Sequence, residues 1–352
     1  MSKIRFNRGV ALGDGAPCFI MLDAGVNHNN DLLRAKELIR SARAGGADAI
    51  KFQTYRADEI STKNAPRYWD STLDTDGGGT QFEMFSRVDD LPKKAYFELK
   101  EYAQEQKILF ASSPFGMDSA RFLKKLDIDF FKIASAEITN YYMIEYIADC
   151  GKPIVMSTGA ATIGEVEKAI DVIQKGGNRQ IALQHCVLSY PCKDEDANLA
   201  KMVRLKQIFP EIPIGYSDHT YGGDVSLAAV ALGACSIEKH YTIDSRLPDS
   251  PDHKFALTSE DLREFVDRCR RVERSIGSYQ RWHYAAEEKA HQLARKSLVA
   301  VRRIKKGEKI TGRAVTCKRP GTGIYPEFRD AVVGRMARRD IEPDELLSWD
   351  MF

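Results

Sequence analysis

The sequence lacks several features that would place it in a special class of protein. No apolar run approaches the roughly 20 residues that a membrane-spanning helix needs. The first residues, MSKIRFNRGVALGDG, lack the apolar core of a secretion signal. The net charge is only +2, because 52 basic residues face 50 acidic ones. Charge therefore gives no general reason to expect nucleic acid or a membrane as a partner. Because no secretion signal is recognisable, we expect a cytoplasmic protein.

Cysteine is also sparse, and no two cysteines form a CxxC pair. The seven cysteines lie at positions 18, 150, 186, 192, 235, 269 and 317. An odd, dispersed set in a chain without a secretion signal predicts reduced thiols rather than a disulfide framework. The chain has 352 residues and is 43% hydrophobic, which is enough for one large domain and a small one.

Short β-rich runs recur along the first 245 residues, and helical patterns such as 31–46, 162–177 and 222–234 lie between them. The eight runs are 18–25, 48–55, 108–115, 130–137, 153–160, 181–190, 212–218 and 235–242. Strands that alternate with helices predict a parallel sheet covered by helices. Eight regular units favour a closed (β/α)8 TIM barrel, an α/β fold, over residues 1–280. A doubly wound open sheet is the alternative.

The C-terminal part has a different pattern. Residues 281–295 form a charged linker with some helical character, and residues 296–352 predict a small β-rich domain. Within it, RRIKKGEKI (302–310) is weakly repeated by RRDIEPDELL (338–347). About 55 residues bury little surface alone, so we expect this domain to dock on something.

Polar side chains gather where the predicted strands end, which is where TIM barrels carry their active sites. Lys51 and Lys132 end the second and fourth strands. Two ammonium groups in one barrel mouth repel each other unless an anion lies between them. Small donors end other strands: Ser113, Ser135, Ser157 and Ser217. This set predicts a phosphate or carboxylate site. A solvated turn is the alternative for each serine, and a Schiff-base role is the alternative for either lysine.

Two histidines end the seventh and eighth strands, which are neighbours in a closed barrel. His219 lies in GYSDHT and His240 in EKHYT. Two imidazoles with open positions suit Mn²⁺, Zn²⁺ or Fe²⁺, which would polarise a carbonyl. Glu238 could hydrogen-bond a ligand water, and Asp252, in the next loop, could bind substrate hydroxyls. Polar loop entries and a Pro/Asp turn are the alternatives. Together the residues suggest a phosphate-releasing or aldol-type condensation.

In their order and spacing, the motifs resemble those of the sialic acid synthases, the N-acetylneuraminate synthases and their bacterial relatives that make legionaminic and pseudaminic acids. The motifs are GVNHN (25–29), KFQTY (51–55), SSPF (112–115), FKIAS (131–135), MSTG (156–159), HC…YP (185–191), GYSDHT (215–220), EKHYT (238–242) and SPDHKFAL (250–257). KRPGTGI (318–324) resembles the family's antifreeze-like domain (SAF, β-clip).

The resemblance implies a metal-dependent condensation of phosphoenolpyruvate with the open-chain aldehyde of an N-acylated amino sugar, such as N-acetylmannosamine. Mn²⁺ is the expected ion, with Mg²⁺ or Co²⁺ as alternatives, held by His219 and His240. The implied contacts to phosphoenolpyruvate are Lys51, Lys132, Ser113, Ser135, Ser157 and Ser217. Gln53, Tyr190 and Asp252 would contact the sugar. The family also forms domain-swapped homodimers, in which Arg319 of the partner subunit would reach the acyl group.

Two positions depart from the family pattern. Asp23, in LDAG, stands where these enzymes usually carry a glutamate, so the catalytic carboxylate is one methylene shorter. Leu188 stands two residues before Tyr190, where a small or amide residue, often asparagine, is usual. Small changes of this kind can shift substrate discrimination about 10-fold or more, so we expect an unusual acceptor.

Two other hypotheses compete with the synthase. One is a Schiff-base aldolase that uses Lys132 or Lys51, and the other is a non-catalytic sugar-binding homologue. Borohydride trapping separates the first from the synthase. The retained lysines, serines and histidines argue against the second.

Overall fold

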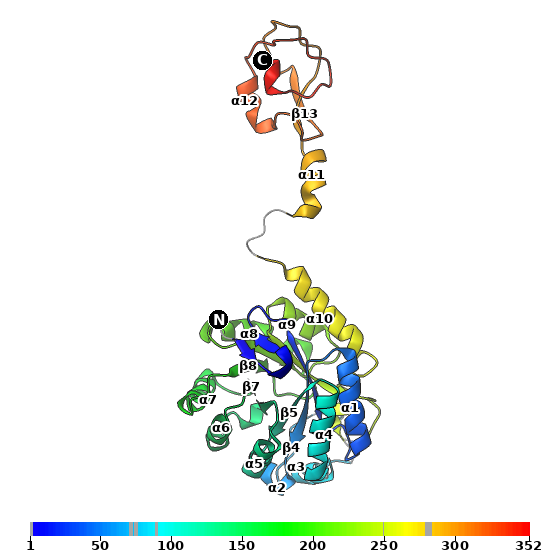
Figure 1. Ribbon diagram of the computed structural model, residues 1–352, viewed down its shortest axis with the longest axis vertical. Coiled ribbons are helices and arrows are strands. Elements are labelled where there is room, and N and C mark those ends of the chain that lie inside the picture. Colours follow the sequence, from blue (N-terminus) through cyan, green and yellow to red (C-terminus); the bar gives the residue numbers. More distant parts are fainter. Residues whose placement is uncertain (1–2, 70–72, 74–76, 89–90, 249, 279–283) are drawn as a thin grey trace. The chain divides into compact units, whose positions relative to one another are not determined.

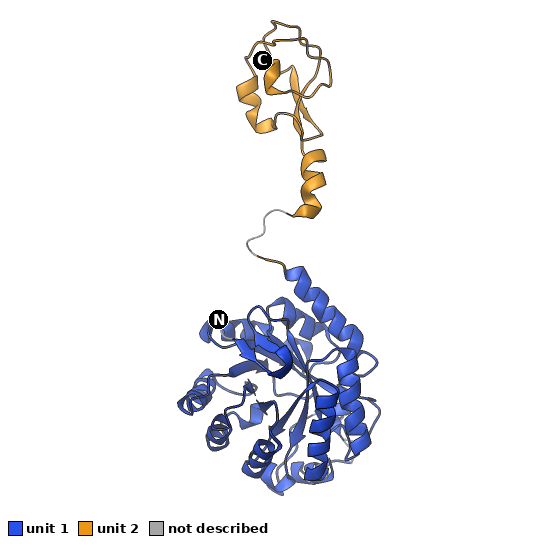
Figure 2. Ribbon diagram, in the orientation of Figure 1, with its two compact units in different colours: residues 1–276 blue, residues 277–352 orange. Residues whose placement is uncertain are grey.

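The computed structural model describes residues 3–69, 73, 77–88, 91–248, 250–278 and 284–352. The chain divides into two compact units, residues 1–276 and 277–352, which are coloured separately in Figure 2. The first unit ends a few residues before the boundary expected at position 280. Part of the expected linker, residues 281–283, lies outside the described residues.

Unit 1 is built around a closed barrel of eight parallel strands (Figure 1). The strands are β3 (Phe19–Gly25), β4 (Ala49–Thr54), β5 (Leu109–Pro114), β6 (Phe130–Ile133), β7 (Ile154–Ser157), β8 (Ile181–Cys186), β9 (Ile214–Asp218) and β10 (Ser236–Thr242). β10 pairs with both β9 and β3, which closes the sheet, and its His240 lies beside Asp23 of β3. The prediction of a TIM barrel is confirmed, and the open sheet is wrong.

Helices follow the strands and cover the outside of the barrel. They are α1 (Leu32–Gly45), α4 (Lys93–Glu105), α5 (Met117–Leu126), α6 (Tyr141–Ala148), α7 (Ile163–Lys175), α8 (Leu199–Ile208), α9 (Asp224–Ala231) and α10 (Leu262–Ile276). Two further helices, α2 (Ala57–Ile60) and α3 (Gln81–Val88), lie between β4 and β5. The Asp31 side chain caps the start of α1, which ends at Gly46 with φ of 95°. A glycine in the left-handed conformation is a common end of a helix, because it lacks the Cβ that would strain this conformation.

Side chains alternate between the two faces of each strand. Outward residues such as Ile237 and Tyr241 join the large core between the sheet and the helices. Inward residues at the amino ends of the strands form a second core, with Phe19, Met21 and Phe130 among them. Ile4 of the hairpin β1 (Lys3–Arg5) and β2 (Ala11–Gly13) packs on this second core. The amino end of the barrel is therefore filled with apolar side chains, and polar inward residues remain at the carboxyl end.

Unit 2 has two regular strands, the antiparallel pair β12 (Ser297–Ala300) and β13 (Val315–Lys318). Its short helices are α11 (Glu288–Leu293) and α12 (Arg329–Val332). The two arms of the predicted internal repeat face each other, because Ile304 and Ile341 exchange two backbone hydrogen bonds of 2.9 and 2.8 Å. The prediction of a small β-rich domain is confirmed, and the paired arms of the repeat add to its antiparallel strands.

The helices that the structure describes include none that combines the length and apolarity needed to cross a membrane.

His28 gives the stability of unit 1 a pH dependence. The side chain is fully buried in the loop after β3, where Nδ1 accepts a hydrogen bond of 3.0 Å from the Asn30 N–H. Burial and the Arg34 cation lower the pKa of His28 from 6.5 to about 4. Between these values the unfolded chain binds a proton that the folded chain does not bind, so stability falls as pH falls from 6.5 to about 4.

We predict that His28 removes roughly 2 kcal/mol of stability between pH 7 and pH 5, at 1.36 kcal/mol per pKa unit. His28→Asn keeps an acceptor for Asn30 and should flatten this part of the profile in urea unfolding followed by circular dichroism. The same substitution at His291, in unit 2, is the control. Parallel profiles for wild type and His28→Asn would contradict the prediction.

Candidate active site

A cavity of about 290 Å³ opens at the carboxyl ends of the barrel strands. Inward residues of seven strands line it: Asp23 of β3, Lys51 and Gln53 of β4, Lys132 of β6, Ser157 of β7, Cys186 of β8, Ser217 of β9, and Glu238 and His240 of β10. Ser135, Tyr190, His219 and Asp252 join them from the loops that follow. Every predicted site residue therefore lines the cavity except Ser113 and Arg319.

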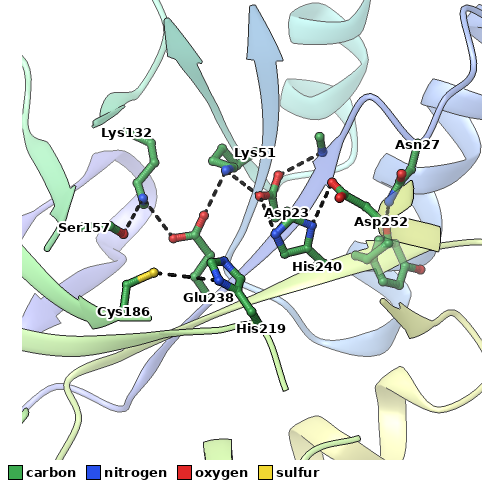
Figure 3. Close-up of polar contacts among 12 residues, drawn as sticks. Asp23, Asn27, Lys51, Lys132, Ser157, Cys186, His219, Glu238, His240 and Asp252 are labelled. Atoms are coloured by element: carbon green, nitrogen blue, oxygen red, sulfur yellow. Dashed lines mark hydrogen bonds and ion pairs between the residues drawn. The ribbon is translucent and has the colours of Figure 1, made fainter. Parts of the chain in front are cut away.

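Alternating charges form a row across the cavity floor (Figure 3). The row runs from Lys132 through Glu238, Lys51, Asp23 and His240 to Asp252. The successive nitrogen–oxygen distances are 3.2, 3.0, 2.6, 3.5 and 3.0 Å. Nearly all of these side chains are buried, so water screens the charges little and each depends strongly on its neighbours.

Glu238 lies between the two lysines. Its Oε1 is 3.0 Å from Lys51 Nζ, and its Oε2 is 3.2 Å from Lys132 Nζ. Burial alone would raise the pKa of Glu238, but the two ammonium groups outweigh it and lower the pKa to about 2. The sequence predicted an anion between the lysines, and in this structure the anion is Glu238. The contact of Glu238 with a ligand water stays a prediction, and the structure adds its position between the lysines.

The two lysines differ in their electrostatic surroundings. Burial lowers the pKa of Lys51, but the carboxylates of Asp23 and Glu238 reverse this, so the pKa is raised. Lys132 has only one carboxylate beside it, that of Glu238. Burial, together with the Lys51 charge, therefore keeps the pKa of Lys132 below its usual value. Lys132 Nζ also donates to Ser157 Oγ over 2.7 Å. Lys132 is thus the more easily deprotonated of the two lysines.

The two histidines lie side by side, with ring centroids 5.2 Å apart. His219 Nδ1 is 2.8 Å from the Val187 carbonyl oxygen, and His240 Nδ1 is 3.0 Å from Asp252 Oδ2. The Val187 carbonyl is an acceptor, so His219 Nδ1 carries hydrogen and its Nε2 is left for a ligand. His240 has a carboxylate beside each ring nitrogen, because its Nε2 lies 3.5 Å from Asp23 Oδ2. Asp252 lines the cavity beside His240, and its contact with a sugar stays a prediction. Burial lowers the pKa of His240, but Asp252 and Asp23 raise it overall.

The donor set fits a divalent metal that is only partly enclosed by protein. Among the residues that the structure describes, no group of three or more His, Cys, Asp or Glu side chains is arranged to hold an ion. The two Nε2 atoms are borderline ligands suited to Mn²⁺, Co²⁺ or Zn²⁺, and water or substrate oxygens would complete the shell. The Nδ1 contacts to a carbonyl and a carboxylate are typical of metal-binding histidines.

The serines occupy different places. Ser157 and Ser217 line the cavity directly. Ser135 Oγ accepts a hydrogen bond of 3.0 Å from the Gly159 N–H, and a Cβ on Gly159 would come within 2.8 Å of this oxygen. Glycine in MSTG therefore permits the close approach. Ser113 does not line the cavity, and its buried Oγ has no hydrogen-bond partner among the described residues.

The remaining predicted residues frame the cavity. The Tyr190 ring lies 4.3 Å from the His219 ring, and Gln53 and Leu188 line the wall. Cys186 also lines the wall, with Sγ 3.9 Å from His219 Nδ1. The sequence analysis quoted HC…YP as a motif but assigned this cysteine no role. Arg319 is exposed in unit 2, so its contact with a substrate stays a prediction.

One wall of the cavity is apolar, and the sequence analysis missed it. We call it the apolar lobe: Val26, Tyr55, Ile60, Trp69, Leu73, Met84, Phe85, Val88 and Phe115. Most of these residues come from the long connection between β4 and β5. The richness of this connection in aromatic residues, and the positions of Met84, Phe85 and Val88 on one face of α3, were the available signals.

Two family models match the chain. Residues 38–281 match the NeuB family, and residues 295–352 match the SAF domain. The chain is 40% identical to N,N'-diacetyllegionaminic acid synthase of Campylobacter jejuni, over 93% of this chain and 98% of that one. It is 33% identical to pseudaminic acid synthase of Helicobacter pylori, over 95% and 97% of the two chains.

Among solved structures, the chain is similar to an N-acetylneuraminic acid (sialic acid) synthetase of Leptospira borgpetersenii in complex with citrate. The TM-score is 0.72 and the identity 33%, and the match covers 82% of this chain and 95% of that one.

We predict that Glu238→Gln destabilises unit 1 by roughly 3 kcal/mol, because it leaves Lys132 buried without a counter-charge. The double variant Lys132→Met/Glu238→Gln should lose less stability than the sum of the two single variants. Urea unfolding of all three variants measures this coupling. Asp244→Asn, which breaks an exposed pair with Arg246, should leave stability nearly unchanged. Strict additivity would contradict the coupling.

Proposed function

The chain belongs to the NeuB family, and on that premise we propose that it condenses phosphoenolpyruvate with the open-chain aldehyde of an N-acylated amino sugar. The products are a nonulosonic acid and phosphate. The observation that carries the proposal is the cavity floor, where two buried lysines lie beside two histidines that present Nε2. This combination provides one site for an anion next to one site for a carbonyl.

The phosphate of phosphoenolpyruvate binds between Lys132 and Lys51. Ser157 Oγ is already within 2.7 Å of Lys132 Nζ, so it adds a donor at the same position. The buried Ser113 Oγ, which has no partner among the described residues, is a further donor near this end of the barrel. A bound phosphate shares the lysine charges that now serve Glu238. The Glu238 pKa therefore rises when substrate binds.

His219 and His240 would hold the metal ion, Mn²⁺ in our proposal, with Mg²⁺ or Co²⁺ as alternatives. When bound, the ion supplies a Lewis acid for the aldehyde oxygen. Asp252 Oδ2 lies 3.0 Å from His240 Nδ1, so a proton on Nδ1 would leave Nε2, on the side of Asp23, as the ligand atom. Val187 does the same for His219 through its carbonyl oxygen.

The chemistry forms one carbon–carbon bond and breaks one carbon–oxygen bond. The methylene carbon of phosphoenolpyruvate attacks the aldehyde carbon, and the aldehyde oxygen gains a proton. Water adds to the cationic C2 and loses one proton. The C2 hydroxyl so formed becomes the ketone as the C2–O bond breaks, and phosphate leaves with the bridging oxygen and the second proton. Glu238 accepts the proton that the water loses, because its pKa has risen once the phosphate occupies the lysines.

The apolar lobe guides the choice of acceptor. It gives the far side of the cavity mostly methyl and ring surfaces, with the Tyr55 hydroxyl and the Trp69 indole as its polar groups. Acyl methyl groups and deoxy carbons bury well on such a surface, whereas free hydroxyls lose their hydrogen bonds to water there. We therefore favour a di-N-acetylated trideoxy sugar over N-acetylmannosamine.

Two further elements of the proposal concern the assembly and its location. We propose a domain-swapped homodimer in which the exposed Arg319 of unit 2 reaches the acceptor in the partner subunit. We also propose a cytoplasmic location, since all seven cysteines are free, which suits a reducing compartment.

The Schiff-base aldolase is the second candidate, and the lowered pKa of Lys132 is the observation that favours it. Borohydride treatment with substrate would inactivate an aldolase and should leave the synthase active.

We predict chelator-sensitive release of phosphate from phosphoenolpyruvate when Mn²⁺ and a suitable aldehyde are present. The panel contains N-acetylmannosamine, its di-N-acetylated trideoxy relatives and simple sugars, each with and without chelator. Phosphate is measured over time, and protein without aldehyde is the control. Lack of release with every aldehyde, from folded protein loaded with Mn²⁺, would contradict the proposed reaction.

We predict that Met84→Gln lowers kcat/KM about 10-fold for a trideoxy acceptor, because it places an amide in the apolar lobe. The effect on N-acetylmannosamine should be much smaller. Met84→Leu keeps the wall apolar and is the matched control. Equal losses for both acceptors would show that the lobe does not select the acceptor.

A further inference from the structure

A second buried ion pair lies on the outer face of the same two strands that carry the histidines. Lys239 Nζ is 3.0 Å from Asp218 Oδ2, and both residues are 1% exposed. Asp218 ends β9 and Lys239 lies within β10. Their side chains point away from the cavity because residues alternate along each strand. Neither residue lines the cavity, and neither has a role in the chemistry proposed above.

The Asp218 carboxylate accepts hydrogen bonds from four donors. Oδ1 accepts from the Thr220 N–H and the Thr220 hydroxyl, each over 2.8 Å. Oδ2 accepts from the Ser226 hydroxyl over 2.5 Å and from Lys239 Nζ. A carboxylate has about four acceptor positions, so this one is saturated and held in a single orientation.

The Asp218–Lys239 ion pair also holds the backbone of Thr220, at its N–H and at its carbonyl oxygen. Asp218 holds the Thr220 N–H, and Lys239 Nζ donates to the Thr220 carbonyl oxygen. The carbonyl oxygen of His219, the residue before, accepts a hydrogen bond of 2.9 Å from the Cys192 N–H. The backbone around His219 is therefore anchored at three points, which leaves only the side-chain torsions of this histidine to be set.

We propose that Asp218 and Lys239 are positioning residues that direct His219 Nε2 into the cavity. With the backbone anchored, the ring reaches the Val187 carbonyl through Nδ1, and only the opposite nitrogen faces the cavity. A buried ion pair contributes little stability compared with apolar residues of similar size, so orientation of the histidine accounts for it better than stability does. The inference rests on the proposed function in one respect, that His219 is a metal ligand.

The first test observes the histidine itself and needs no metal. In ¹⁵N-histidine-labelled protein, NMR should show His219 as one tautomer with the proton on Nδ1. His219→Asn assigns its signals. Asp218→Asn/Lys239→Met removes both charges together, which avoids a lone buried ion, and should convert His219 into a mixture of tautomers. An unchanged tautomer in this variant would overturn the inference.

The second test measures Mn²⁺ affinity by the EPR signal of free Mn²⁺. The double variant should bind Mn²⁺ about 10- to 100-fold more weakly, the usual effect of removing an outer partner of a metal ligand. The matched control is Asp48→Asn/Arg270→Met, which removes another partly buried ion pair, of 3.2 Å, at the amino end of the barrel. The control should keep the wild-type Kd, and equal Kd values in the two double variants would overturn the inference.

Two further outcomes are also decisive. If the double variant does not fold, Thr220→Val removes only one donor to Asp218 and should still weaken Mn²⁺ binding several-fold; a wild-type Kd and a single tautomer would then overturn the inference. If the wild-type protein binds no Mn²⁺, the metal in the proposed function is wrong, and the tautomer measurement alone decides the role of Asp218 and Lys239.

Discussion

The cavity depends on one interaction, the contact of the Glu238 carboxylate with two buried ammonium groups. Without Glu238, Lys51 and Lys132 would repel each other inside a barrel that excludes most water. With it, the two ammonium groups have a shared counter-charge, and Asp23, His240 and Asp252 continue the same alternation of charge. The same arrangement suits an anionic ligand, because Lys51 and Lys132 already lie close together before the ligand binds. The free energy needed to bring the two ammonium groups together is supplied by folding.

Strand β10 contributes to two different ion-pair groups, because its inward and outward faces carry different charged residues. Glu238 and His240 point inward to the cavity, while Lys239 between them points outward to Asp218. A shift of β10 by one residue would exchange the two faces and place Lys239 in the cavity. Closure of the barrel by pairing with β3 and β9 fixes this register. The period of two along a strand is therefore a functional constraint as well as a packing rule.

Much of the fold and of the cavity could be predicted from the sequence, for physical reasons. Strand runs and glycine stops are local signals, and the barrel rule brings distant strand ends such as Lys51 and Glu238 together. The partners within the cavity could not be predicted in this way. Whether Asp252 faces a sugar or His240 depends on the conformation of a loop, and whether Glu238 serves water or lysines depends on side-chain distances. The apolar lobe was missed because its residues come from an irregular connection, where neither period of two nor period of 3.6 is informative.

Asp23 shows how a departure from the family pattern can be accommodated. Sialic acid synthases usually carry a glutamate here, which is one methylene longer. In this chain Oδ2 of Asp23 is 2.6 Å from Lys51 Nζ, and Oδ1 accepts a hydrogen bond of 2.9 Å from the Gly25 N–H. Gly25 has φ of 48°, and a Cβ there would lie 3.5 Å from Asp23 Oδ1 and 3.6 Å from Asp252 Oδ2. The glycine thus lets the backbone turn over the shorter carboxylate and bind it directly. Both oxygens of Asp23 are engaged, so the shorter carboxylate holds Lys51 on the cavity floor without the extra methylene of a glutamate.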